Sequence, residues 1–197
     1  GGAAQQSMSQ TWQDAVDAIR KLGDRVENLA ARVVAVAVTA QGDGTWLVGA
    51  NNQPVDDAWI WLDARAAHTV ETLNQHPLAT ERFKATGTGL NTCQQGSQLA
   101  HMDQHYPELL AKSEVALHCK DWLYLNLTGV RATDPSEASF TFGNFRTQRY
   151  DDPVIAALGL EHRRHLLPEI IDGTQTTHPL TAEAANLTAL RAGTPLS

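Results

Sequence analysis

Apolar side chains recur at steps of three and four residues near the start of the chain, at Trp12, Val16, Ile19, Val26 and Leu29. Polar residues fill the positions between them, which is the pattern of an amphipathic helix. The spacing predicts one helix over residues 10–32. Ser9 or Thr11 is expected as its N-cap, because a hydroxyl oxygen there can accept a hydrogen bond from the first turn.

A continuous run of small apolar residues follows at 33–39. Such a run needs cover on both faces, so it predicts a central strand of an α/β sheet. It ends in a polar loop, 41–44, that contains two glycines. The pattern then predicts a strand, a turn and a returning strand at residues 45–48, 50–54 and 58–62.

The rest of the chain mixes helical periodicity with polar loops. Helices are predicted at residues 63–76, 97–105, 121–127 (ending at Gly129), 154–158 and 181–190. A polar loop rich in glycine and amides is predicted at 86–96, and a turn at 134–139 leads into 140–142. A strand begins near residue 196. No repeat or linker divides the pattern, so residues 1–197 are interpreted as a single α/β domain.

Charge and composition exclude several classes of protein. Fifteen basic residues face 22 acidic ones, for a net charge of −7. No basic stripe is present, so a nucleic-acid partner is not expected. No apolar run approaches the ~20 residues of a membrane helix, and the first residues lack signal-peptide character, so no membrane association is expected. Cys93 and Cys119 have no metal-type spacing, and a cytoplasmic location is expected.

His101 and His105 are four residues apart on a predicted helix, a spacing that could present two imidazoles to a metal ion. The intervening residues do not form a zincin motif, and a third ligand is not evident nearby. A solvated helix face explains the pair better, and no metal site is predicted. A metal hydrolase built on these histidines ranks last among the functional hypotheses.

The loop 41–44 is the strongest candidate for chemistry. Open α/β sheets bind ligands beyond the carboxyl ends of their strands, where this loop lies. Gln41 and Asp43 could hold vicinal hydroxyls, and the glycines allow close approach of the backbone. The adjoining tryptophans could cover the apolar face of a sugar; they are Trp46, Trp59 and Trp61. A polar turn beside core tryptophans explains the same residues, and both interpretations remain open at this point.

Several segments together resemble one protein family. Residues 37–47, with the sequence AVTAQGDGTWL, resemble the strand and sugar-binding loop of the N-terminal domain of FGGY carbohydrate kinases. The family patterns W-x-D-x-R, K-D-[YW]-L…T-G, T-D-x-S-[DNE]-A-S and L-x-x-G-T-P are matched at residues 61–66, 120–129, 133–139 and 190–195. The matches occur in the family's order and spacing, and the loop is most similar to the erythritol and L-xylulose kinase branch.

This resemblance implies an actin-like (ribonuclease H-type) α/β domain that binds the sugar. By position, Gln41, Gly42 and Asp43 would touch substrate. Gln95 falls near a substrate-contacting tyrosine of glycerol kinases, and Glu137 matches an acidic or amide position. The family transfers the γ-phosphate of ATP, with Mg²⁺, to a primary hydroxyl of a small polyol or ketose. Erythritol is the favoured substrate.

Family elements missing from the pattern shape the remaining expectations. The first phosphate-loop hairpin and the C-terminal ATP-binding domain are not matched, and the general-base aspartate is expected just beyond Ser197. The chain is therefore expected to hold no catalytic residue and no bound cofactor, and to be inactive alone. Open strand edges would favour self-association as a homodimer. The alternative hypothesis is a non-catalytic polyol-binding or regulatory module.

Overall fold

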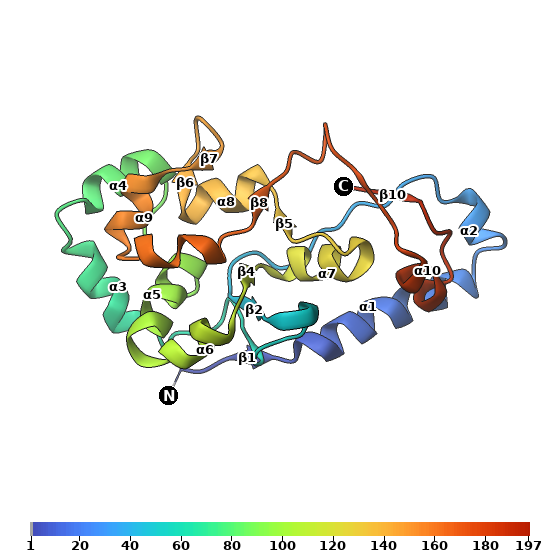
Figure 1. Ribbon diagram of the computed structural model, residues 1–197, viewed down its shortest axis with the longest axis horizontal. Helices are drawn as coiled ribbons and strands as arrows, with labels where there is room; N and C mark the ends of the chain where they lie inside the picture. The colour runs from blue at the N-terminus through green and yellow to red at the C-terminus, as the bar shows by residue number, and fades with distance from the viewer. Residues whose placement is uncertain (1) are drawn as a thin grey trace.

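Helices and short strands alternate along the chain in the computed structural model, which describes residues 2–197 (Figure 1). The α-helices are α1 (Met8–Gly23), α2 (Leu29–Arg32), α3 (Ala67–Asn74), α4 (Ala79–Thr86), α5 (Gln95–His105), α6 (Pro107–Lys112), α7 (Cys119–Thr128), α8 (Pro135–Thr141), α9 (Asp152–Ala157) and α10 (Ala182–Thr188). Two 3₁₀ helices are η1 (Ala50–Asn52) and η2 (Glu161–Leu166).

The strands are short and pair two by two. They are β1 (Gln5–Gln6), β2 (Trp46–Val48), β3 (Ala58–Trp59), β4 (Val115–Leu117), β5 (Ala132–Thr133), β6 (Gly143–Asn144), β7 (Arg149–Tyr150), β8 (Glu169–Ile170), β9 (His178–Pro179) and β10 (Pro195–Leu196). The β5–β8 pair is parallel, whereas β1–β3, β2–β4, β6–β7 and β9–β10 are antiparallel. The β2–β4 ladder lies at the centre, and in its register Trp46 is opposite Leu117.

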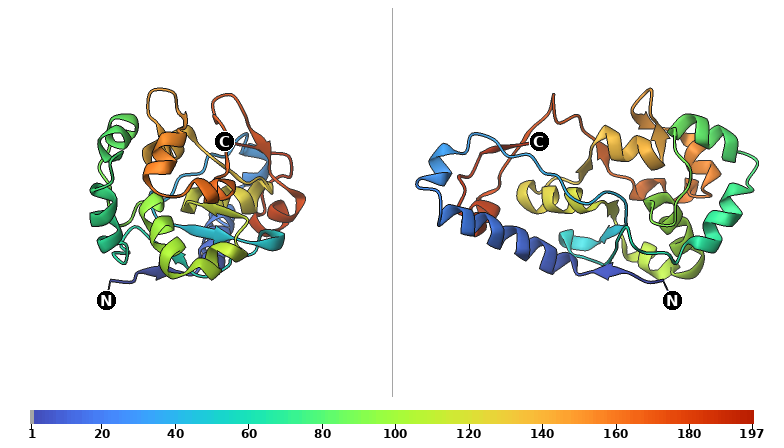
Figure 2. Two further views of the ribbon diagram at one scale, coloured as in Figure 1. Left: turned by 60° about the vertical axis from the view of Figure 1, so that its left-hand side comes forward. Right: turned by 180° about the vertical axis from the view of Figure 1, so that it is seen from behind.

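The molecule is elongated, with α7 and the β2–β4 ladder between two ends (Figure 1). Helices α3, α4, α5 and α9 gather at one end, and α2 and α10 at the other. The long helix α1 runs along one side toward α10, as the view from behind also shows (Figure 2). Residue contacts link α1 with both α7 and α10. This arrangement places the start of β2, and the loop before it, in the middle of the molecule.

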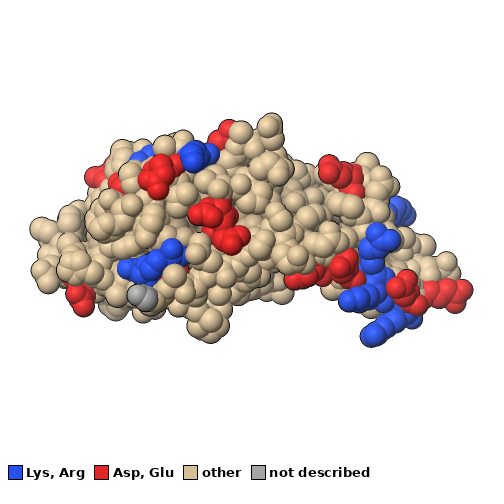
Figure 3. Space-filling view, turned by 90° about the horizontal axis from the view of Figure 1, so that it is seen from below, with Lys and Arg blue, Asp and Glu red and all other residues tan. Residues whose placement is uncertain are grey.

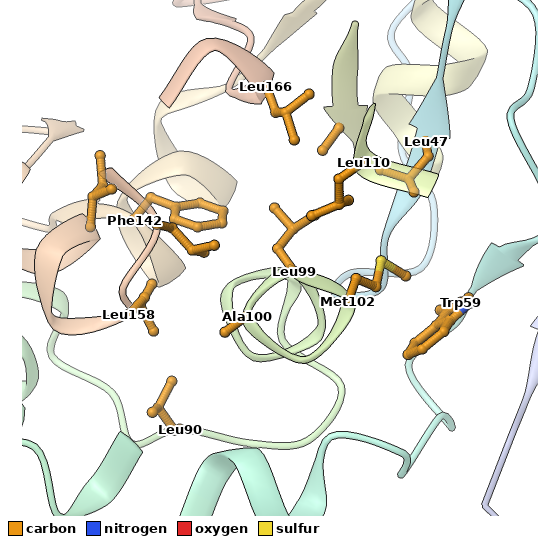
Figure 4. Packing of buried hydrophobic residues seen from close by; sticks show 13 residues of the cluster. Leu47, Trp59, Leu90, Leu99, Ala100, Met102, Leu110, Phe142, Leu158 and Leu166 are labelled. Carbon is orange, nitrogen blue, oxygen red and sulfur yellow. The ribbon is translucent and has the colours of Figure 1, made fainter. Parts of the chain in front are cut away.

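Buried apolar side chains form three clusters, each under a different part of the fold. The largest joins β2 and β3 to α5, α8 and α9, and includes Leu47, Trp59, Leu99, Phe142 and Leu158 (Figure 4). A second lies on the opposite face of β2, around Trp46 and Trp122. The third lies between α7 and α10. Since full burial of one such side chain contributes about 1.5–3 kcal/mol, these clusters hold the central ladder in place.

The helix predicted over 10–32 is divided in two, which corrects the prediction. Helix α1 begins at Met8, with Ser7 as its N-cap, and ends at Gly23. Asn28 then adopts a left-handed backbone with φ of 56°, before the short helix α2. The apolar period continued past the break because Ile19 and Leu29 pack against the same cluster. A periodic pattern reports the shared cluster, not the continuity of the helix.

The prediction of a strand buried on both faces at 33–39 is also wrong. The segment is extended and forms only an isolated bridge, Val36 to Leu196, with flanking hydrogen bonds to Pro195 and Ser197. Val34 is 76% exposed, whereas Val36 packs against the third cluster. Among residues 2–197 no element covers the outer face of this segment. An apolar run does not reveal how many of its faces are covered.

Two shorter predictions also need correction. The predicted turn at 134–139 is the start of α8, with Asp134 accepting hydrogen bonds from the backbone N–H groups of Ser136 and Glu137. The helix predicted at 63–76 begins later, at Ala67, because Asp63 instead accepts a hydrogen bond from the backbone N–H of Ala4. A local side-chain cap thus sets the start of α8, whereas at Asp63 a contact distant in sequence takes the side chain away from the helix.

The other helix predictions are confirmed in position. Helix α7 extends the one predicted at 121–127 and ends at Gly129, whose left-handed φ of 76° closes the last turn. Helices α5, α9 and α10 overlap the segments predicted at 97–105, 154–158 and 181–190. The strand at 45–48 is confirmed by β2, and the strand expected near residue 196 is β10.

On the face seen from below, lysine and arginine side chains gather mainly where α1 ends, interspersed with acidic residues (Figure 3). The last turn of α1 contributes Arg20 and Lys21 to this group. The rest of that face carries scattered charges of both signs. Within residues 2–197, every helix is too short or too polar to cross a bilayer.

Candidate functional site

The loop 41–44 is folded into a tight turn that leads the chain into β2. Asp43 has a left-handed backbone with φ of 58°, and Gly44 follows with φ of 83°. A Cβ on Gly44 would lie 2.6 Å from the carbonyl oxygen of Trp59, so only glycine fits there. The backbone N–H and carbonyl of the next residue, Thr45, pair with Trp59. The turn therefore holds the Asp43 carboxylate at the edge of the central ladder.

A second loop, from the predicted polar stretch at 86–96, is attached to this turn through Cys93. The Cys93 thiol donates a hydrogen bond to Oδ2 of Asp43 at 3.4 Å, and its carbonyl accepts one from the N–H of Gly44 at 2.9 Å. Burial, together with the neighbouring Asp43 charge and hydrogen bond, raises the pKa of Cys93 to about 11. The thiol consequently stays protonated at neutral pH and remains a hydrogen-bond donor.

We expect Cys93 to be slow in alkylation despite being partly exposed. At pH 8 the raised pKa reduces its thiolate fraction, and hence its rate with iodoacetamide, by about a hundredfold relative to an ordinary thiol. The measurement is mass spectrometry of time points in buffer and in urea, where both cysteines should react at the ordinary rate. Rapid labelling of Cys93 in the folded protein would contradict its contact with Asp43.

Glu137 faces the same loop from α8. A Cβ on Gly42 would lie 3.3 Å from Oε1 of Glu137, so the glycine leaves room beside this carboxylate. Oε2 of Glu137 lies 3.3 Å from Nε2 of His118, a buried side chain at the N-terminal end of α7. The Glu137 carboxylate therefore lies beside Gly42, the neighbour of Asp43 in the loop.

Behind Glu137 lies a buried network of charges. Nδ1 of His118 is 3.3 Å from Oδ2 of Asp121, whose carboxylate also accepts a hydrogen bond from the backbone N–H of His118. Lys120 bridges Asp121 and Asp134 at 2.5 and 2.6 Å. The network therefore contains two basic side chains, His118 and Lys120, and three carboxylates. Of these carboxylates, Glu137 is the one that reaches the loop 41–44.

The pKa values of this network follow from burial and from these contacts. For His118, burial lowers the pKa, but the Asp121 hydrogen bond and the charges of Glu137 and Asp121 outweigh it, so the net direction is upward. For Asp121, burial raises the pKa, but the hydrogen bonds and charges of His118 and Lys120 lower it by more, so the net direction is downward. Burial dominates at Glu137, whose pKa is raised. Glu137 is thus the most readily protonated carboxyl group facing His118.

The remaining residues predicted for the site have internal partners. Gln95 begins α5, is 1% exposed, and donates a hydrogen bond to the carbonyl of Leu117 at 2.7 Å. Gln41 is half-buried and donates to Oε1 of Gln6 at 3.0 Å. Gln41 thus bonds to β1 and Gln95 to β4, whereas Gly42, Asp43 and Glu137 lie at or beside the loop 41–44.

The tryptophans divide between the two interpretations left open above. Trp46 and Trp59 are core residues, with 0% and 2% exposure. Trp61 is 51% exposed. Within the W-x-D-x-R segment, Asp63 pairs with Arg65 at 2.7 Å, and the Arg65 guanidinium stacks 3.3 Å from the Trp59 ring centroid. This segment therefore contacts β3 through Arg65 and the N-terminal residues through Asp63, which accepts a hydrogen bond from Ala4.

Sequence reasoning missed the residues behind the site. Lys120 and Asp121 were noticed as part of a family pattern but received no role, and His118 and Cys93 carried no recognisable motif. The signal that could have found Asp121 is its place three residues after His118, at the N3 position of a helix, where carboxylates cap the first turn. No local signal indicates that His118 contacts Glu137, because the two come from different helices.

The two histidines weighed as metal ligands lie at the far end of α5 from Gln95. His101 and His105 stack with ring centroids 4.4 Å apart, and Nδ1 of His101 is 2.9 Å from Oγ1 of Thr69. Within residues 2–197, no third histidine, cysteine or carboxylate joins them in a group that could hold a metal ion.

A cavity of about 120 Å³ lies beside Lys120 and Asp134. It is lined by Val38, Lys120, Asp121, Tyr124, Ala132, Thr133, Asp134, Ile171, Gly173 and Ser197. None of the five predicted site residues reaches it. We place the candidate site at the Gly42 loop instead, since that is where uncommitted carboxylate oxygens gather, and the cavity lining is mainly apolar with its charges already paired.

Comparison with known proteins shows the class to which this fold belongs. The structure superimposes on the xylulose kinase of Rhodospirillum rubrum with a TM-score of 0.89 at 21% identity, covering 99% of this chain and 40% of that one. It superimposes on the Plasmodium falciparum glycerol kinase with a TM-score of 0.81 at 19% identity, over 99% and 40%. The chain has the α/β fold of a sugar-kinase domain.

The sequence comparison is more specific. The profile of the FGGY family of carbohydrate kinases, N-terminal domain, matches residues 1–197, and the chain belongs to this family. It is 70% identical to the erythritol kinase of Brucella abortus, over 100% of this chain and 38% of that protein. It is 29% identical to the L-xylulose/3-keto-L-gulonate kinase of Escherichia coli, over 99% and 39%. The chain thus spans about two fifths of the length of these relatives.

Proposed function

We propose that this protein is an ATP-dependent kinase that phosphorylates a primary hydroxyl of a small neutral polyol or ketose, with erythritol as the first choice. The observation that carries the proposal is that Glu137 faces Gly42 in the same loop that carries the Asp43 carboxylate. Carboxylate oxygens are acceptors only, and vicinal hydroxyls are donors that match them. The 70% identity to an erythritol kinase supports this choice of substrate.

The charge of the site favours a neutral substrate over an anionic one. Two basic groups face three carboxylates in the buried network, and Asp43 adds a further negative charge at the loop. A sugar acid would bring another carboxylate into this field, and like charges in a partly buried site repel strongly. Polyols and ketoses carry no such penalty.

The roles proposed for the chain's own residues are those of binding and orientation. Asp43 accepts hydrogen bonds from substrate hydroxyls, and Gly42 leaves room for the substrate beside Glu137. Gln41 keeps an amide oxygen available after donating to Gln6. Gln95 supports the floor of the site through its bond to Leu117. Holding a hydroxyl in line for attack is a large part of what a kinase contributes to phosphoryl transfer.

The described residues fit a polyol better than a nucleotide. Lys120 is the lysine of the network, and it is already paired with both Asp121 and Asp134. It therefore offers no free charge to a triphosphate. We propose that ATP, Mg²⁺ and the general base are bound or supplied by residues outside 2–197. When bound, MgATP supplies the phosphoryl group.

The test is ADP release by the product of the complete reading frame that encodes this chain, with MgATP and a panel of substrates. The panel contains erythritol, other tetritols and pentitols, glycerol, ketopentoses and one sugar acid. We expect turnover with erythritol or a close relative and none with the sugar acid. If the folded protein releases no ADP with any substrate of the panel, the kinase proposal is overturned. Binding of a polyol in calorimetry without turnover would favour a non-catalytic binding module.

A further inference from the structure

We propose that His118 is a positioning residue, present as an imidazolium, that holds Glu137 so that its free oxygen faces the substrate space at Gly42. This inference rests on the proposed function and adds a residue to it. It is carried by a juxtaposition of two helices. His118 occupies the N-cap position of α7, Glu137 belongs to α8, and their side chains meet beside the loop that carries Asp43.

The imidazole ring lies between two carboxylates, one at each nitrogen. Nδ1 is 3.3 Å from Oδ2 of Asp121, and Nε2 is 3.3 Å from Oε2 of Glu137. The His118 side chain is 5% exposed, so water does not screen these contacts. A neutral ring has one N–H and could donate to only one carboxylate, whereas the imidazolium donates to both.

The Asp121 end of this arrangement is fixed. Its carboxylate accepts from the backbone N–H of His118 at 3.0 Å and pairs with Lys120. Lys120 also reaches Asp134, the N-cap of α8, so α7 and α8 are joined at two points. The His118 ring therefore has little freedom, and Glu137 is the movable partner that it orients.

The unshared oxygen of Glu137 defines what this orientation achieves. Oε2 is occupied by His118, and Oε1 is the atom that would contact a Cβ on Gly42. The Glu137 side chain is 20% exposed, so Oε1 can accept a hydrogen bond from a bound hydroxyl. Without the imidazolium, Glu137 could rotate or take up a proton, since burial already raises its pKa.

A pH dependence of substrate binding follows from the groups around His118. They are Asp121 and Lys120 on its own helix, and Glu137 and Asp134 from the α8 segment. The net effect of these groups and of burial raises the pKa of His118 above its usual value. The ring therefore keeps its charge to a higher pH than an ordinary histidine does, and positioning is lost as the pH rises through that raised pKa.

The kinetic experiment compares His118→Gln with wild type in the complete enzyme, using erythritol and MgATP between pH 6 and 10. In wild type we expect KM for the polyol to rise on the alkaline side. In His118→Gln we expect KM to be about tenfold higher than in wild type, with a smaller change in kcat and no alkaline rise. His162→Gln is the matched control, because that histidine also pairs with a carboxylate, Asp103 at 2.9 Å, but on the surface. It should leave both KM and its pH profile unchanged.

A double-mutant cycle separates positioning from a general loss of structure. In a Glu137→Gln background, His118→Gln should have little further effect on KM, because the charge that the imidazolium holds is gone. Equal effects of His118→Gln in both backgrounds would overturn the proposal. Thermal melts establish that each variant is folded. If wild type itself releases no ADP with any polyol, the proposed function fails. The protonation state of His118, measured by NMR, then tests the inference separately.

The protonation of His118 can be observed without turnover. Nitrogen-15 NMR of histidine-labelled enzyme distinguishes an imidazolium from a neutral ring, and His118→Gln assigns the signal. We expect two protonated ring nitrogens at neutral pH, with titration shifted to the alkaline side of an ordinary histidine. A neutral ring, with one unprotonated nitrogen, would overturn the proposal.

Discussion

Replacing Asp43 by alanine should raise the KM of the complete enzyme for its polyol by about 10- to 100-fold. Hydrogen bonds to a charged group contribute about 1.5–3 kcal/mol, and each 1.4 kcal/mol corresponds to a factor of ten. Asp43 can accept hydroxyls because the Gly44 turn and the Cys93 thiol hold its carboxylate at the loop. The effect should be larger on KM than on kcat, since the proposed role is binding. Steady-state ADP release measures both constants.

Two variants make the Asp43 result interpretable. Asp43→Asn keeps a residue type that tolerates the left-handed backbone but removes the charge, so it should share most of the loss. Asp57→Ala removes an exposed carboxylate from the segment before β3 and should leave KM unchanged. An unchanged KM in Asp43→Ala would remove this loop from the substrate site.

Replacing Asp121 by alanine should lower the free energy of unfolding by about 3–5 kcal/mol. Removing one partner of a buried ion pair leaves the other charge without compensation in a medium of low dielectric. Here the change would strip a partner from both His118 and Lys120, and the backbone N–H of His118 would lose its acceptor. Urea unfolding followed by circular dichroism gives the free energy. The control is Glu183→Ala, an exposed acid in the first turn of α10, which should change it by less than about 0.5 kcal/mol.

The pH dependence of stability provides a check on the same network. The folded-state pKa of Asp121 is lowered, so its contribution is present above the pKa of the unfolded chain and is lost as the pH falls through the folded value. The folded-state pKa of His118 is raised, so its contribution is present below the unfolded value and is lost as the pH rises through the folded one. Wild type should lose stability on the acid side through Asp121. If the free energy of unfolding of Asp121→Ala falls with decreasing pH as steeply as that of wild type, this account is contradicted.

Sequence patterns predicted elements well where a local signal marks both ends. Helix α7 is an example. Its apolar face is followed by Gly129, and glycine is the residue that most readily adopts the left-handed backbone of a helix C-cap. The patterns failed where distant contacts decide. The segment 33–39 is equally apolar whether one or two faces are covered, and Val34 turned out to be exposed. The break after Gly23 was hidden because both sides of it pack on one cluster.

The candidate site shows the same division. The loop with Gln41, Gly42 and Asp43 could be singled out as a candidate, because glycines and short polar side chains follow an apolar extended segment there. Its support could not be predicted. Cys93 lies 50 positions from Asp43 in the chain, and His118 meets Glu137 across two helices. Spacing along the chain carries no information on such contacts.

By itself, the sequence determined the class of fold and the membership of a kinase family, and it singled out the loop that we propose as the substrate site, because these depend on residue types in local order. Only the tertiary structure decided that Asp43 is tethered by a thiol, that Glu137 is faced by a buried histidine, and that Lys120 is already neutralised by two carboxylates. The physical reason is that burial and pairing set the charge and orientation of a side chain. Both arise when segments far apart in the chain pack together.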